Sequence, residues 1–324
     1  LIVATQGRSV WMIDDLTVLH QMEKNLMNRE FHLFAPMPSY RTGGYQQKEP
    51  KKAGLNHPGG VMVHYFLKEK PADTMEVKLS FFEGRGEKIR EFSTKAKEKK
   101  NQLKLEKGGN CFVWNMRYED AKKFDGMILW WGSLNGPKAM PGKYRVDLLV
   151  GDQVQTADFE IVKDPRSPAQ GKDFVTQFNF IKSVNDKVSE AHQAIIDIRE
   201  IRAQLKNYTK RLSDDEKYQP LKDQATAIDS TMTAIETTLY QTKNKSGQDP
   251  LNFPIRLTNK LAHLNSLSFG DYPPTDAAIA VRDEMIGLIE VELAKMKMVK
   301  TVELPAFNQL VKEIGVDAVI LKEE

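Results

Sequence analysis

The feature that most constrains the fold of this chain is a change of hydrophobic period at residues 164–168, which read Asp-Pro-Arg-Ser-Pro. Before this point apolar residues alternate with a period of two, as in half-buried strands, and after it they recur every three or four residues, as in amphipathic helices. The prolines stop both kinds of element. The sequence therefore predicts an α+β chain of more than one domain, a β-rich part followed by an α-rich part.

The β-rich part is expected over residues 61–165. Alternation begins at Val61, and further alternating runs occupy 77–81, 112–116, 144–150 and 159–161. Glycine-containing turns separate these runs. About seven short strands over about 100 residues are typical of an Ig-like or fibronectin-like β-sandwich. The Lys-rich stretch at 95–107 interrupts the pattern, and we interpret it as a long solvated loop.

The α-rich part is expected to form an antiparallel helical bundle over residues 168–324. The apolar positions predict helices at these places: 174–205, 221–239, 257–264 and 281–296. The second shows the alternating steps of four and three that are typical of bundle packing. Residues 213–216 resemble an N-terminal helix signal, and Thr275, after two prolines, is a candidate cap of the fourth helix.

The first 60 residues do not fit either part. Apolar runs at 1–4 and 10–13 flank a turn-prone segment and predict a hairpin, and 36–60 holds too many prolines and glycines for a regular element. The first run has neither an initiator Met nor a cleavage site, so we interpret it as a strand whose partners precede it. Residues 1–60 are therefore expected to be the end of another domain and a wrapping linker.

Four separated segments carry a resemblance to a known family. Residues 3–11 read VATQGRSVW and are followed by IDDL, and residues 110–118 contain Trp114, Arg117 and Tyr118. The segments PGKY at 141–144 and DPR at 164–166 follow in the same order. Together they resemble the C-terminal region of bacterial sortilin-like, BNR-repeat β-propeller proteins, which are often labelled glycosyl hydrolases.

The resemblance implies an exported protein, periplasmic, outer-membrane-associated or secreted, in which a propeller precedes these residues. Residues 1–60 would then contain the last propeller strands, followed by an Ig-like domain and a helical domain. The function expected is a non-catalytic scaffold that braces the propeller or docks a protein partner at the cell envelope. Two alternatives stay open: accessory domains of a glycan or peptide hydrolase whose active site lies in the propeller, and a carbohydrate-binding module.

Composition excludes several kinds of function. The 47 basic and 44 acidic residues are interspersed and leave a net charge of +3, so no nucleic-acid partner is expected. No apolar run approaches the roughly 20 residues of a membrane span. The single cysteine rules out an intrachain disulfide and a Cys-based zinc site. The six histidines include no pair at helical ligand spacing, so neither a metal nor a cofactor is expected.

Few side chains are candidates for chemistry, and no catalytic residue is predicted. Asp14 and Asp15 follow Trp11 closely, but neighbours on a strand point to opposite faces and cannot flank one glycosidic bond, so we expect turn and cap hydrogen bonds from them. Trp130 and Trp131 are the candidate binding residues. We expect one to point inward and the other outward on the sandwich, where they pack in a core and an interface or, alternatively, form a sugar-stacking platform.

Cys111 is expected at the start of a strand, as a small buried hydrophobic residue. No base flanks it in the sequence, which argues against a nucleophile.

Overall fold

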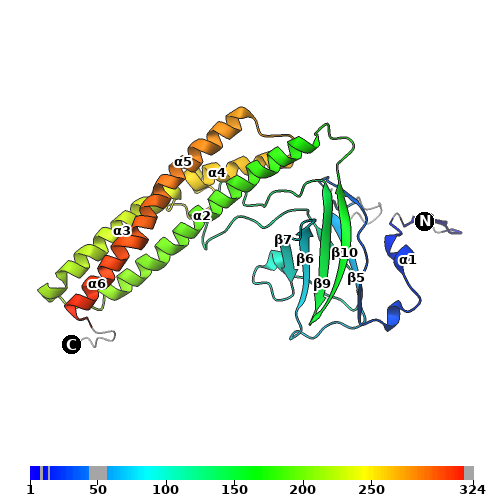
Figure 1. The fold of residues 1–324 in the computed structure, drawn as a ribbon, viewed down its shortest axis with the longest axis horizontal. Coiled ribbons are helices and arrows are strands. Elements are labelled where there is room, and N and C mark those ends of the chain that lie inside the picture. The colour runs from blue at the N-terminus through cyan, green and yellow to red at the C-terminus, as the bar shows by residue number, and fades with distance from the viewer. Residues whose placement is uncertain (8–9, 14, 44–56, 317–324) are drawn as a thin grey trace. The chain divides into compact units, whose positions relative to one another are not determined.

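The computed structural model describes residues 1–7, 10–13, 15–43 and 57–316. The chain is an α+β protein with two compact units (Figure 1). Unit 1 comprises Leu1–Glu119 and Lys138–Val175 and holds the sheets, and unit 2 comprises Asp120–Pro137 and Thr176–Glu324 and holds the long helices. The chain therefore leaves unit 1, enters unit 2 and returns before the last strands are formed.

Unit 1 contains a five-stranded sheet and a three-stranded sheet besides a small hairpin. The five-stranded sheet has the order β4-β10-β9-β6-β7, formed by Ser39–Tyr40, Gln153–Val162, Gly142–Val150, Val77–Glu83 and Lys88–Ser93. The three-stranded sheet has the order β3-β5-β8, formed by Phe31–Leu33, Val61–Leu67 and Gly108–Trp114. Neighbouring strands are antiparallel except β4 and β10, which are parallel.

Both sheets contribute side chains to one hydrophobic cluster. Alternate residues of β5 are buried, as the period of two predicts. Trp114 on β8 stacks on Phe81 of β6, with ring centroids 4.4 Å apart, and thereby joins the two sheets. The Trp114 indole nitrogen donates a hydrogen bond of 3.1 Å to the Arg117 carbonyl, so its polar atom is satisfied inside the core.

Three strands were not expected from the sequence. β3 and β4 fall within residues 1–60, which were expected to be the end of another domain and a linker, yet they form outer strands of the two sheets. Both have at most three residues, too few to display a period. β7 was also missed, whereas the other runs form β5, β6, β8, β9 and β10 as expected. The Lys-rich stretch is not wholly solvated, because Leu103 and Leu105 within it are buried.

Unit 2 is built from these helices: α2 (Gly171–Thr209), α3 (Gln219–Leu239), α4 (Leu257–His263), α5 (Asp276–Met298) and α6 (Leu304–Ile314). One hydrophobic cluster collects their buried side chains. The expected cap of the fourth helix is confirmed, since the Thr275 hydroxyl accepts from the Ala278 amide at 3.2 Å. Asp215 accepts from the Lys217 amide at 3.0 Å and caps the 3-10 turn Glu216–Tyr218 that precedes α3, whereas α3 itself has no side-chain cap.

The C-terminal helices differ from the prediction. A π-helical turn, Val299–Glu303, connects α5 to α6, and the sequence indicated neither this turn nor α6. The apolar positions expected on the fourth helix are also not all buried. Met285 and Met296 are buried, whereas Val281 and Leu288 are exposed.

The segment Asp120–Pro137, named the strap here, was expected to belong to the sandwich and instead belongs to unit 2. It contains no strand. Ala121 and Phe124 are buried in the hydrophobic cluster of the helices, which explains the assignment.

The first residues form the expected hairpin, with β1 (Ile2–Ala4) antiparallel to β2 (Val10–Met12). Arg8 and Ser9 of its turn, Asp14, and residues 44–56 of the predicted linker lie outside the described residues. A short helix α1 (Thr17–Gln21) and a 3-10 turn (Leu26–Asn28) lead from the hairpin to β3. Within the described part of the chain, β1 and β2 pair only with each other.

Candidate functional site

Side chains of the helices hold the strap by its backbone. The Asn259 amide group on α4 accepts from the Trp130 backbone N–H and donates to the Trp130 carbonyl, both at 2.8 Å. Asn265 and Asn185 donate to the carbonyls of Ser133 and Asn135, at 2.5 and 3.0 Å. All three asparagines are buried. Polar groups of an irregular buried segment must find partners, and here amide side chains supply them.

The N-terminal half of the strap is held in the same way. The Ser189 hydroxyl accepts from the Lys122 amide at 3.0 Å, and the His192 ring donates from Nδ1 to the Lys122 carbonyl at 2.6 Å. A carbonyl only accepts, so Nδ1 carries a proton. Burial lowers the pKa of His192, which favours the neutral form of the ring. The Tyr240 hydroxyl accepts from the Ile128 amide at 2.9 Å.

Phe124 of the strap is surrounded by aromatic and charged groups of α2 and α3. The Tyr240 and His192 rings meet it edge to face, at 4.9 and 5.0 Å between centroids, and the Arg199 guanidinium lies 4.7 Å from its centroid. Arg199 also bonds at 2.7 Å to Glu236, a buried carboxylate. This ion pair neutralises Glu236 next to an apolar anchor of the strap.

The two candidate tryptophans do not lie on a strand, contrary to the expectation. They lie on the strap, where Trp130 is partly buried and Trp131 is 77% exposed. The Trp131 backbone has a φ of 59°, a left-handed conformation that bulky residues rarely adopt. The next residue is tightly packed, because a Cβ on Gly132 would lie 3.2 Å from the Asn259 side chain and 3.3 Å from the Ala262 Cβ, so a larger residue there would require these neighbours to shift. The strap thus holds an aromatic ring in solvent in a strained conformation.

The β1–β2 hairpin is a second exposed apolar surface. These side chains are at least 44% exposed: Leu1, Ile2, Val3, Val10, Trp11, Met12 and Ile13. Successive residues of a strand point to opposite faces, so the described part of the hairpin is apolar on both faces. Apolar area of this kind marks a contact with another surface.

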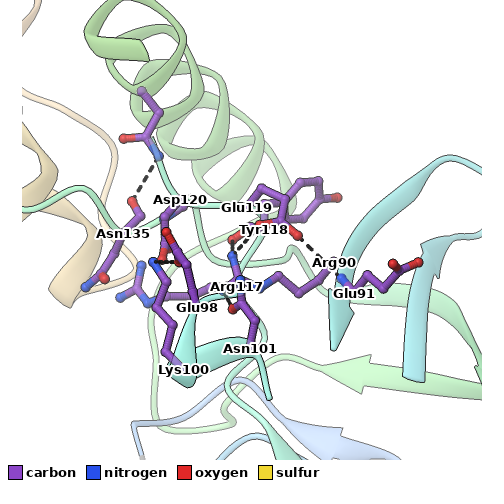
Figure 2. A network of polar contacts seen from close by, with 12 residues as sticks. Arg90, Glu91, Glu98, Lys100, Asn101, Arg117, Tyr118, Glu119, Asp120 and Asn135 are labelled. Carbon is purple, nitrogen blue, oxygen red and sulfur yellow. Dashed lines mark hydrogen bonds and ion pairs between the residues drawn. The ribbon is translucent and has the colours of Figure 1, made fainter. Parts of the chain in front are cut away.

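A buried arginine organises the end of unit 1 from which the strap departs. Figure 2 shows Arg90 of β7 beside Asn101, Tyr118 and Glu119. Its guanidinium donates to the Glu119 carboxylate at 2.8 Å, to the Asn101 side chain at 2.8 Å and to the Tyr118 carbonyl at 3.3 Å. The sequence did not indicate this group, because its members come from separate segments. Its geometry anchors residues 118–119 and leaves the guanidinium fully engaged, so we assign it a structural role.

Cys111 is exposed rather than buried, which corrects the prediction. The register of β5 and β8 places His64 directly opposite, with His64 Nε2 3.9 Å from the Cys111 sulfur and 3.9 Å from the Asp15 carboxylate. Desolvation and the Asp15 charge raise the pKa of the thiol. A catalytic thiol needs the opposite shift and a base oriented through its other nitrogen, whereas the Cys111 sulfur and the Asp15 carboxylate lie at the same nitrogen of His64, so we assign no catalytic role to this group.

Asp15 has the turn role expected for it. Its carboxylate accepts from the Thr17 amide at 2.9 Å. Hydrogen bonding from Thr17 and the nearby His64 and His57 together lower the pKa of Asp15. Asp14, the other member of the pair, lies outside the described residues.

Among the described residues, no group of three or more His, Cys, Asp or Glu side chains is arranged to hold a metal ion. The same part of the chain contains no helix with the length and apolar character needed to cross a membrane. Comparison with known proteins found no matching family model, no matching curated protein and no matching solved structure.

Proposed function

We propose that this chain is a non-catalytic scaffold and interaction region of an exported sortilin-like protein, and that its hairpin adds two strands to a propeller of the same protein. The observation that carries the proposal is the β1–β2 hairpin, apolar on both faces and exposed. A lone two-stranded ribbon is marginal in water, and its unpaired edges are templates for further strands. A propeller blade has four strands and would supply the missing ones.

The same proposal includes the finer architecture. Unit 1 would be an Ig-like β-sandwich, supported by two sheets that share one core around Trp114 and Phe81. Unit 2 would be an antiparallel helical bundle, supported by long helices that share one core. The two units then brace the propeller or dock a protein partner at the cell envelope.

Hydrogen–deuterium exchange tests the role of the hairpin. We expect the amides of Ile2–Ala4 and Val10–Met12 to exchange slowly in the natural full-length protein and rapidly in the 324-residue chain. Rapid exchange in both would contradict the proposal, because a hairpin inside a blade is protected.

A substitution in the hairpin tests the proposed blade contact by its effect on the stability of the protein. Trp11→Ser should destabilise the full-length protein and leave the 324-residue chain unchanged, since Trp11 is 65% exposed in the chain. Met27→Ser is the matched control, because Met27 has nearly the same exposure, 66%, outside the hairpin. Equal effects of the two substitutions on the full-length protein would argue against a blade contact at Trp11.

A carbohydrate-binding module is the second candidate, and the exposed Trp131 favours it. An aromatic ring held rigidly in solvent suits stacking on the apolar face of a sugar. Titration of the chain with β-linked and α-linked oligosaccharides should then perturb tryptophan fluorescence, and Trp131→Ala should abolish the response. A response unchanged by this substitution would remove the candidate. The hydrolase alternative would require acidic residues clustered in the propeller.

A further inference from the structure

Helix α5 carries apolar side chains on two adjoining faces. One face is buried in the core of unit 2 and contains Met285, Ile289 and Met296. The other is exposed, and its members Val281, Leu288, Val291 and Met298 are 43–54% accessible to solvent. A surface helix of a monomer normally presents charged and polar residues to water on this side. The exposed apolar face of α5 therefore indicates an interaction surface.

The exposed residues follow a strict spacing. Positions 281, 284, 288, 291, 295 and 298 advance in alternating steps of three and four, as the a and d positions of paired helices do. Glu284 and Lys295 are the two charged members of this series, named the α5 seam here. The seam ends with Met298, where the π-helical turn begins and changes the residue spacing.

The charges of the seam identify its partner. When two copies of α5 run antiparallel about a twofold axis at residues 289–290, position 284 lies opposite position 295, 288 opposite 291, and 281 opposite 298 of the partner subunit. Leu288 then faces Val291 of the partner subunit, and Glu284 faces Lys295 of the partner subunit. In a parallel pair like charges would face each other, which selects against that orientation.

We propose that the α5 seam is a self-association surface through which two copies of this chain form an antiparallel dimer. The contact is isologous, so each copy contributes the same residues and two Glu–Lys pairs form. Lys295 also bonds to Glu292 of the same helix at 2.7 Å. This proposal is independent of the role given to the hairpin.

The size of the seam sets the strength of the dimer. α5 has 23 residues and is therefore about 35 Å long. One pair of helices of this length lies at the small end of specific interfaces, so we expect a dimer in reversible equilibrium with the monomer.

Sedimentation equilibrium of the 324-residue chain from about 1 μM to about 500 μM tests the proposal and should show a monomer–dimer equilibrium. Glu284→Lys should raise the dissociation constant by about tenfold, because Lys then faces Lys295 of the partner subunit. Glu284→Lys combined with Lys295→Glu should restore the original affinity. An equimolar mixture of the two single variants should form a heterodimer, in which every pair is again of opposite charge. Glu313→Lys on α6 is the matched charge control and should leave the constant unchanged.

Two further variants keep the test valid if Lys295→Glu unfolds unit 2 by removing the partner of Glu292. Glu284→Gln should weaken the dimer less than Glu284→Lys, and Leu288→Glu should weaken it more, each with unchanged far-UV circular dichroism. A chain that stays monomeric at every concentration would overturn the proposal. So would a dimer that responds equally to Glu284→Lys and Glu313→Lys, or a double charge reversal that restores nothing in a folded protein.

Discussion

The sheets of unit 1 and the strap of unit 2 satisfy their backbone polar groups in opposite ways. In the sheets, strands such as β5 and β8 bond through their backbones, so each ladder bond is independent of side-chain identity. The strap has no strand, and individual side chains of the helices satisfy much of its backbone, alongside a few backbone bonds such as that of the Ser133 amide to the Ala262 carbonyl. The comparison shows that apolar burial limits substitution in the sheets, whereas single polar residues limit it in the strap.

The largest expected effect tests whether apolar burial limits substitution in the sheets. Trp114→Ala should destabilise unit 1 by about 3–5 kcal/mol, because it removes the fully buried ring that stacks on Phe81. Urea denaturation, followed by circular dichroism and by hydrogen–deuterium exchange of the β-strand peptides, measures this loss of stability. Val113→Ala, at the exposed neighbouring position, should cost less than about 0.5 kcal/mol. Similar costs for the two would show that the core is not organised around Trp114.

Asn259→Ala tests whether a single polar side chain limits substitution in the strap. It leaves both the N–H and the carbonyl of Trp130 without their partner and should cost unit 2 about 2–4 kcal/mol. The exposed Lys260→Ala is the control on the same helix, and helical circular dichroism during urea denaturation is the measurement. A loss of stability as large for Lys260→Ala as for Asn259→Ala would refute the idea that Asn259 holds the strap in unit 2.

Acidification should destabilise unit 2 through the protonation of His192. Its pKa is lowered by burial below the ordinary 6.5, so the unfolded chain binds its proton at a higher pH than the folded unit does. The contribution of the neutral ring to stability is complete above that value and is lost as the pH falls toward the lowered pKa. The free energy of unfolding of unit 2 should therefore decrease on acidification.

His192→Gln should flatten this dependence, because the amide can still donate to the Lys122 carbonyl and does not titrate. His20→Gln, at an exposed position, should leave the profile unchanged. The interpretation fails if the His192→Gln profile is as steep as that of the natural chain.

The smallest expected effect on stability concerns the strained backbone of the strap at Trp131. Trp131→Gly should stabilise unit 2 by about 0.5–1 kcal/mol, because glycine adopts a positive φ without the steric cost that Trp131 bears. Thermal unfolding measures the gain, and Trp131→Ala should show less of it. A loss of stability instead would mean that the Trp131 ring makes contacts that outweigh the strain.

Much of the fold was predictable because the signals are local. The strands β5, β6, β8, β9 and β10 and the first helices were read from periodicity, and Thr275 from its side chain and position. The hairpin was read from two apolar runs around a turn. The strap was misassigned because Ala121 and Phe124 show no period and their contacts lie on distant helices. His64 opposite Cys111 was missed, since strand register is not visible in one sequence.

The sequence by itself determined where strands give way to helices, that Thr275 caps α5 and which aromatic residues are available for a core or a surface. These properties depend on periodicity and on bonds between near neighbours. Only the tertiary structure decided that the strap belongs to the helices, that Trp131 is exposed while Trp130 is partly buried, and that α5 has one buried and one exposed apolar face. Each depends on contacts between segments far apart in the chain, for which local pattern carries no information.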